Sequence, residues 1–160
     1  MALGDKVIIT CAVTGAVTTK KQCAAIPYSA VEIGEECRRA YEAGATVVHV
    51  HGRSDDGQPS YRPEVFHAYK REIEKRCPVI INFSTGAVGL SKEERIKHVL
   101  ETKPSIGALN MGSMNYAKYS AKRKEFVFEF VFANPFKTFI SCPSTSIFIT
   151  SGSKFNIWHN

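Results

Sequence analysis

The sequence predicts an α/β fold built on a parallel β-sheet. Short apolar, β-branched runs alternate with amphipathic helical segments along the first two thirds of the chain, which is typical of βαβ units. Each predicted strand also ends in small, hydroxyl, imidazole or amide residues, as strands do at the mouth of a barrel where ligands bind. With 160 residues, 44% of them hydrophobic, the chain is long enough for the core of one domain.

Four strands are predicted, each of them short, apolar and followed by a turn. They cover residues 6–13, 45–51, 78–83 and 105–111. Three helices are expected between them. The first and third begin at capping-box pairs and the second at a proline suited to the first helical turn: Ser29 with Glu32, Ser91 with Glu94, and Pro63.

The second strand ends in Val-Val-His-Val-His, residues 47–51. Because side chains alternate faces along a strand, His49 and His51 should point the same way, with Cα atoms about 6.5 to 7 Å apart. Imidazole is the commonest metal ligand in proteins, so the pair predicts a metal site. A catalytic zinc usually has three protein ligands, and the third must then come from elsewhere. That each histidine is simply a hydrogen-bonded structural residue remains the alternative.

Composition limits the classes of function. A net charge of +6 suits an anionic ligand, such as a carboxylate or a phosphate-bearing cofactor, and is weak support for nucleic acid. An odd number of cysteines, 5, argues for reduced thiols and a cytoplasmic protein. We find neither a signal-peptide pattern nor a membrane-spanning stretch, and therefore expect no membrane partner.

The last part of the chain departs from this pattern. Residues 125–132 could form a fifth strand, ended by Asn134 and Pro135. From residue 138 onward the composition shifts to serine, threonine and bulky apolar residues without a single acid. Neither a helical period nor a pairing signal is present there, so residues 137–160 are assigned as an unplaced tail.

Four segments together resemble a known family. They are I-I-T-C-A-V-T-G-A at 8–16, E-A-G-A-T-V-V-H-V-H-G-R-S-D-D-G-Q-P-S at 42–60, I-I-N-F-S-T-G at 80–86 and L-N-M-G-S-M-N-Y at 109–116. The second is the most specific, because it joins the histidine pair to an arginine and a D-G-x-P-S turn. Over about residues 5–136 the chain resembles the β-keto acid cleavage enzymes, typified by 3-keto-5-aminohexanoate cleavage enzyme.

The resemblance implies a zinc-dependent (β/α)8 TIM barrel, and residues 5–136 would be its N-terminal part, with about the first four to five βα units. It implies a retro-Claisen exchange, in which a β-keto acid and acetyl-CoA give a new acyl-CoA and acetoacetate. Zinc would act as a Lewis acid on the keto and carboxylate oxygens. Full-length relatives would be homo-oligomers.

The resemblance also assigns roles by position. His49 and His51 correspond to the two histidine ligands of the zinc, and Ser84 to a serine that contacts substrate. Thr85 and Gly86 lie beside that serine. Asn110 falls on the position of the fourth strand that lines the substrate pocket.

Two departures from the family pattern affect these expectations. Val17 stands where the typical enzyme has a glutamate for the substrate's amino group, so a keto acid with a neutral or apolar side chain is expected. The family's late glutamate ligand, the following aspartate and a nearby arginine have no counterpart, so no catalytic residue is identified. We interpret the tail as the mark of a gene fragment, frameshift or alternative reading of a longer enzyme, and expect little activity and a tendency to aggregate.

Two other functions stay open. A metal hydrolase of the amidohydrolase type also has a spaced histidine pair, although on its first strand. No later metal histidine stands out, because His67 and His98 fall in helices and are expected at the surface, and His159 lies in the tail. The third alternative is a non-catalytic barrel fragment that binds a metal or a carboxylate weakly, or folds only with a partner.

Overall fold

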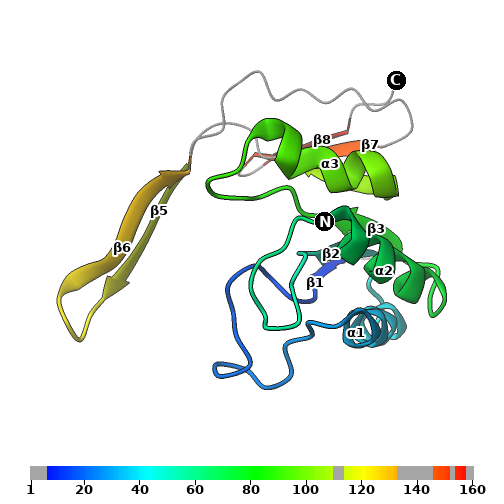
Figure 1. Cartoon of the computed structure of the whole chain (residues 1–160), viewed down its shortest axis with the longest axis horizontal. Coiled ribbons are helices and arrows are strands. Elements are labelled where there is room, and N and C mark those ends of the chain that lie inside the picture. Colours follow the sequence, from blue (N-terminus) through cyan, green and yellow to red (C-terminus); the bar gives the residue numbers. More distant parts are fainter. Residues whose placement is uncertain (1–6, 110–113, 133–145, 152–153, 158–160) are drawn as a thin grey trace.

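The computed structural model describes residues 7–109, 114–132, 146–151 and 154–157, in which a β-sheet carries three helices (Figure 1). The elements in chain order are β1 (Thr10–Ala12), α1 (Ala30–Glu42), β2 (Val47–Val50), α2 (Pro63–Glu74), β3 (Ile80–Phe83), α3 (Lys92–Thr102), β4 (Ile106–Leu109), β5 (Met114–Ser120), β6 (Glu125–Phe132), β7 (Ser146–Ser151) and β8 (Lys154–Ile157). The predicted alternation through β4 is confirmed, with strands shorter than expected. None of the helices in the described ranges is long and apolar enough to cross a membrane.

The first four strands lie side by side in chain order and are parallel. The sheet runs β1-β2-β3-β4-β7-β8, so β2 has a neighbour on each side. His49 on β2 is paired with Ala12 on β1 and with Asn82 on β3. The polar residues that follow β1, β2 and β3 therefore meet at one edge of the sheet, the carboxyl edge where α/β folds bind ligands.

The helix starts follow the predicted local signals. Ser29 and Ser91 each cap a helix, and in both capping boxes the carboxylate of the glutamate three residues later accepts a hydrogen bond from the backbone N–H of the serine. Pro63 occupies the first turn of α2, where its missing N–H costs nothing. These starts place α1, α2 and α3 after β1, β2 and β3, and each helix packs beside the next in chain order.

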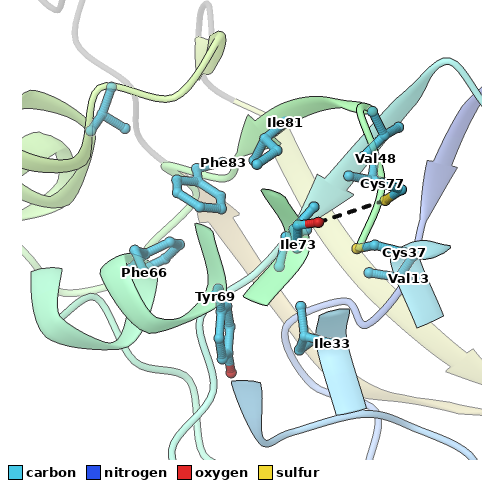
Figure 2. Close-up of a cluster of buried hydrophobic side chains, with 13 residues drawn as sticks. Val13, Ile33, Cys37, Val48, Phe66, Tyr69, Ile73, Cys77, Ile81 and Phe83 are labelled. Carbon is cyan, nitrogen blue, oxygen red and sulfur yellow. Dashed lines mark hydrogen bonds between the residues drawn. The ribbon is translucent and has the colours of Figure 1, made fainter. Parts of the chain in front are cut away.

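A buried apolar cluster lies between the helices and one face of the sheet (Figure 2). Its members are Val13, Ile33, Cys37, Val48, Val50, Phe66, Tyr69, Ile73, Cys77, Val79, Ile81, Phe83 and Val99. Complete burial of one such large side chain contributes about 1.5 to 3 kcal/mol. Because side chains alternate along a strand, His49 and Asn82 belong to the opposite face, where Ile80 keeps 40% of its surface exposed.

The late strands differ from the expected fifth barrel strand. β6 covers the predicted residues 125–132, but it pairs antiparallel with β5 and forms a hairpin that extends away from the sheet (Figure 1). A short turn with Lys124 at φ 56° replaces a crossover helix, which antiparallel neighbours do not need. The unplaced tail contains two strands: β7 pairs parallel with β4, and β8 pairs antiparallel with β7. Such pairing at the edge of a sheet is made by backbone groups, so the pattern of side chains is a poor predictor of it.

The prediction that His98 lies at the surface is wrong. Its side chain on α3 is fully buried and its ring stacks on Phe66 of α2, with ring centroids 3.9 Å apart and planes inclined by 22°. His67 is exposed, as predicted. A neutral imidazole with a hydrogen-bond partner can be buried in a core at little cost. Which face of α3 is buried depends on the packing of α2 against it, and the sequence of α3 alone does not show this. His159 lies outside the described residues.

Candidate functional site

The two histidines after Val48 form a close pair at the carboxyl edge of β2. His49 is within the strand and His51 follows it directly. Their Nε2 atoms are 3.2 Å apart, with ring centroids separated by 5.0 Å and ring planes nearly perpendicular. The predicted placement of both side chains on one side, near enough to share an ion, is therefore confirmed. Their role as metal ligands stays a prediction.

Burial keeps both imidazoles neutral. It lowers the pKa of His51 to about 4, with smaller contributions from His49 and from the Arg53 guanidinium. Burial also lowers the pKa of His49, and the neighbouring Asn82 side chain opposes part of that shift. The buried Oδ1 atom of Asn82 nevertheless makes no full hydrogen bond within the described part of the chain. Metal ions bind neutral imidazole, so the pair is in the form a metal requires.

The geometry of the pair fits a zinc ion. With Zn–N bonds of about 2.0 to 2.1 Å and tetrahedral angles, two bound nitrogens lie about 3.3 Å apart. The observed Nε2 separation is 3.2 Å, which also suits a hydrogen bond between the rings when no ion is bound. Across residues 7–109 and the described strands that follow, no group of three His, Cys, Asp or Glu residues could hold a metal together. This part of the chain therefore offers two ligands of the usual three.

The predicted substrate segment lies next to this pair. Ser84 follows β3 directly, and its N–H donates to the Val50 carbonyl at 3.0 Å, which places it beside His51. Ser84 and Thr85 are buried, whereas Gly86 is half-buried. The Ser84 Oγ accepts a bond from the Gly86 N–H at 3.3 Å, and a hydroxyl also carries one proton to donate to a ligand. Nothing in these contacts assigns the segment a ligand, so its role remains a prediction.

A buried arginine joins the loops around the site. Arg53 is only 2% exposed, and its guanidinium lies over the Tyr28 ring, 4.7 Å from the centroid. It donates to three backbone carbonyls, those of Gly57 at 2.8 Å, Gly15 at 2.9 Å and Thr18 at 2.7 Å. The arginine thus ties the loop after β1 to the loop after β2. Its position in the motif was noticed from the sequence, but this bridging role was not.

The loop held by Arg53 presents Val17 to solvent. Val17 lies between the two carbonyls that the arginine binds in this loop, and 79% of its surface is exposed.

Asn82 is a further residue of the site that the sequence analysis missed. The sequence feature that could have identified it is its place in the next strand, where it pairs with His49. Asn110 lies outside the described residues.

Comparisons with known proteins agree with the earlier resemblance. The profile of the family described as beta-keto acid cleavage enzyme matches residues 6–144. The chain is 43% identical over 114 residues to 3-keto-5-aminohexanoate cleavage enzyme of Acetoanaerobium sticklandii, which covers 70% of this chain and 41% of that protein. It is 39% identical over 121 residues to 3,5-dioxohexanoate:acetyl-CoA acetone transferase of Paraburkholderia graminis, which covers 74% and 39% respectively. Identity to 3-oxoadipate:acetyl-CoA acetyltransferase of Cupriavidus necator is 37% over 110 residues, 68% of this chain and 38% of that protein.

The chain spans about two fifths of the length of these curated relatives. The matched residues include the whole parallel run from β1 to β4, with the histidine pair and the Ser-Thr-Gly segment at its carboxyl edge. The resemblance seen in four sequence segments is therefore confirmed. This chain belongs to the beta-keto acid cleavage enzyme family.

Proposed function

We propose that this chain takes part in a retro-Claisen exchange, in which a β-keto acid and acetyl-CoA yield a new acyl-CoA and acetoacetate. The observation that carries the proposal is the pair of half-buried, neutral imidazoles of His49 and His51 beside Ser84. Membership of the family supports it, and two of the three relatives described above have acetyl-CoA in their names. The matched relatives are longer, so the activity of the whole protein is part of the proposal.

His49 and His51 are the residues that would hold zinc, and their Nε2 separation of 3.2 Å fits that role. When bound, zinc supplies a Lewis acid for the keto and carboxylate oxygens of the substrate. The Ser84 hydroxyl, with Thr85 and Gly86 beside it, would bind and orient the substrate's carboxylate end. Asn110, outside the described residues, is proposed to line the same pocket.

The side chain of the keto acid is proposed to be uncharged. Val17 is exposed on the loop that Arg53 ties to the loop after the histidines, and an apolar residue cannot pair with an ammonium group. An ammonium that closed over Val17 on binding would lose part of its water without gaining a partner. A neutral or apolar substituent meets no such cost. In a panel of short β-keto acids, those with an uncharged side chain should therefore bind more tightly than amino-substituted ones.

A zinc titration tests the metal site. His49→Ala and His51→Ala should each weaken zinc affinity at least about tenfold, because each removes one of the two ligands that the described residues offer. His67→Ala is the matched control, since His67 is exposed on α2 and should leave the affinity unchanged. Competition with a chromophoric chelator at neutral pH measures all four proteins. Equal zinc affinity in all of them would refute the site.

Ligand binding to the zinc-loaded chain tests the substrate class. Acetoacetate should bind more tightly than butanoate, which has the same length and carboxylate but lacks the keto oxygen. Ser84→Ala should weaken acetoacetate binding more than zinc binding. Equal affinity for the two acids would contradict the proposed substrate, and equal loss of both ligands in the variant would assign Ser84 a structural role.

A non-catalytic role in binding a metal or a carboxylate is the second candidate. It is favoured by one observation, that the described residues bring no third metal ligand to the histidine pair. Zinc and acetoacetate binding without turnover would be its signature.

A further inference from the structure

Three consecutive backbone carbonyls after β3 each accept a hydrogen bond from a different side chain. The pairs are His98 Nε2 with the Ser84 oxygen at 2.9 Å, Arg95 Nε with the Thr85 oxygen at 3.1 Å, and Tyr61 Oη with the Gly86 oxygen at 2.7 Å. We refer to Tyr61, Arg95 and His98 as the carbonyl clamp. One member comes from the loop after β2 and two come from α3. The proposed substrate segment is thus held from two separate elements.

All three clamp residues are in donor form at neutral pH. Burial raises the pKa of Tyr61, which keeps its phenol protonated. Burial lowers the pKa of His98 to about 4, so the ring is neutral, and its bond to a carbonyl requires the proton to be on Nε2. The other ring nitrogen, Nδ1, is buried and has no hydrogen-bond partner among the residues described. Burial lowers the pKa of Arg95, but the pKa of a guanidinium is so high that the group remains a cation and donates.

The clamp is itself fixed by its surroundings. His98 is fully buried and stacks on Phe66, which in turn meets Phe83 edge to face with centroids 4.8 Å apart. Arg95 is only 7% exposed. The Thr85 hydroxyl adds a bond to the Ala108 carbonyl on β4, at 2.5 Å. Because His98 and Arg95 are buried, we expect the Ser84–Gly86 segment to keep one conformation before any ligand arrives.

This arrangement favours an anionic ligand. Backbone carbonyl oxygens carry partial negative charge and would repel a nearby carboxylate. In the Ser84–Gly86 segment each of the three accepts a hydrogen bond, which offsets part of that repulsion, and one donor is a full cation. Ordering of a loop during binding also reduces affinity, and a segment ordered in advance avoids that loss.

We propose that Tyr61, Arg95 and His98 are positioning residues, which hold the Ser84–Gly86 segment ready for the carboxylate of a β-keto acid. The proposal rests on the proposed function for the identity of the ligand. It adds residues from α3 and from the loop after β2 to a site otherwise built at the ends of strands.

Tyr61→Phe is the sharpest test, because it removes one hydroxyl and leaves the half-buried ring. The zinc-loaded variant should bind acetoacetate about 3- to 10-fold more weakly than the unaltered chain, the usual effect of one lost hydrogen bond. Its zinc affinity should not change, since His49 and His51 are untouched. Amide hydrogen exchange at residues 84–86 should accelerate. Tyr41→Phe, which removes the hydroxyl of an exposed tyrosine on α1, is the matched control.

His98 provides a rescue experiment. His98→Gln keeps an N–H donor near the Ser84 carbonyl, whereas His98→Ala removes it. Acetoacetate affinity should fall more in the alanine variant than in the glutamine variant, with zinc affinity equal in both. A purely structural role would instead reduce zinc and acetoacetate binding together.

The outcomes separate this inference from the proposed function. If acetoacetate binds the unaltered chain and Tyr61→Phe equally well, the positioning role is overturned and the substrate class stands. If the unaltered chain binds zinc but no β-keto acid, the proposed substrate class is refuted. Amide hydrogen exchange at residues 84–86 then tests the carbonyl clamp by itself. Faster exchange in Tyr61→Phe than in Tyr41→Phe then supports the clamp, and equal rates overturn it.

Discussion

At the scale of single residues, the candidate site gathers polar side chains that are buried or half-buried. His49, His51 and His98 all have their pKa lowered by burial, and Arg53 is buried with its charge spread over three carbonyls. Such groups are costly to bury without partners. Their presence around one edge of the sheet supports the proposed site at that edge.

His98 makes stability depend on pH. Its pKa is about 4 in the folded chain and about 6.5 when unfolded, so the unfolded chain takes up the proton first as the pH falls. The contribution of His98 to the free energy of unfolding is fully present above about pH 6.5. It is lost progressively as the pH falls toward 4, and the loss amounts to about 3 kcal/mol. Urea unfolding near pH 7 and near pH 4 measures the loss.

His98→Gln is the control for this measurement, because glutamine does not titrate. The variant should lose less stability than the unaltered chain over the same pH range. Since His49 and His51 titrate in both proteins, only the difference between the two proteins reports on His98. An equally steep dependence in both would show that other groups cause the acid sensitivity.

At the scale of elements, a helix start is encoded within one turn, whereas the composition of a strand does not select its partner. Both capping boxes occur where serine and glutamate are three residues apart, because all the atoms involved belong to one turn. β6 forms where its β-rich composition predicts, yet its partner β5 was not foreseen. An eight-residue aromatic strand can pair on either edge, and composition does not select the edge.

The cap of α3 offers a test at this scale. Ser91→Ala removes the side-chain acceptor for the Glu94 N–H, and should lower the free energy of unfolding by about 1 kcal/mol. Ser91→Asp retains a capping oxygen and should remain close to the unaltered chain. Urea unfolding of the three proteins measures both effects. Equal stability of the alanine and aspartate variants would show that the cap contributes nothing.

At the scale of the whole molecule, helices cover one face of the sheet, and the face with His49 is more open. Ala12, next to His49 in the sheet, is exposed, and Ile80 is 40% exposed. The described residues bring two imidazoles together without a third ligand, and the sequence after Glu129 has no acid to supply one. A metal held by two ligands is weakly bound, and catalysis needs groups from several strands held together.

We therefore expect the purified 160-residue chain to show little or no cleavage activity. Acetoacetate formation from acetyl-CoA and a panel of short β-keto acids, with zinc added, measures this. Losing a group that acts mainly in the transition state lowers kcat rather than only raising KM. Steady turnover at a typical enzyme rate of about 1 to 1000 per second would show that other residues of this chain complete the site.

The sequence by itself determined the order of β1 to β4 with their helices, the helix starts at Ser29 and Ser91, and the shared side of His49 and His51. These features depend on periodicity and caps within a few residues, so local pattern was sufficient. The family also followed from sequence, because four segments matched together.

Only the tertiary structure decided that His98 is buried, that Arg53 ties two loops together, and that three carbonyls of the Ser84–Gly86 segment are clamped. It also decided that β6 forms a hairpin and that β7 extends the sheet beside β4. Apart from the β5–β6 hairpin, whose strands are joined by one short turn, each of these depends on contacts between segments far apart in the chain. The burial and hydrogen bonds of a side chain are set by those neighbours, and no local periodicity encodes them.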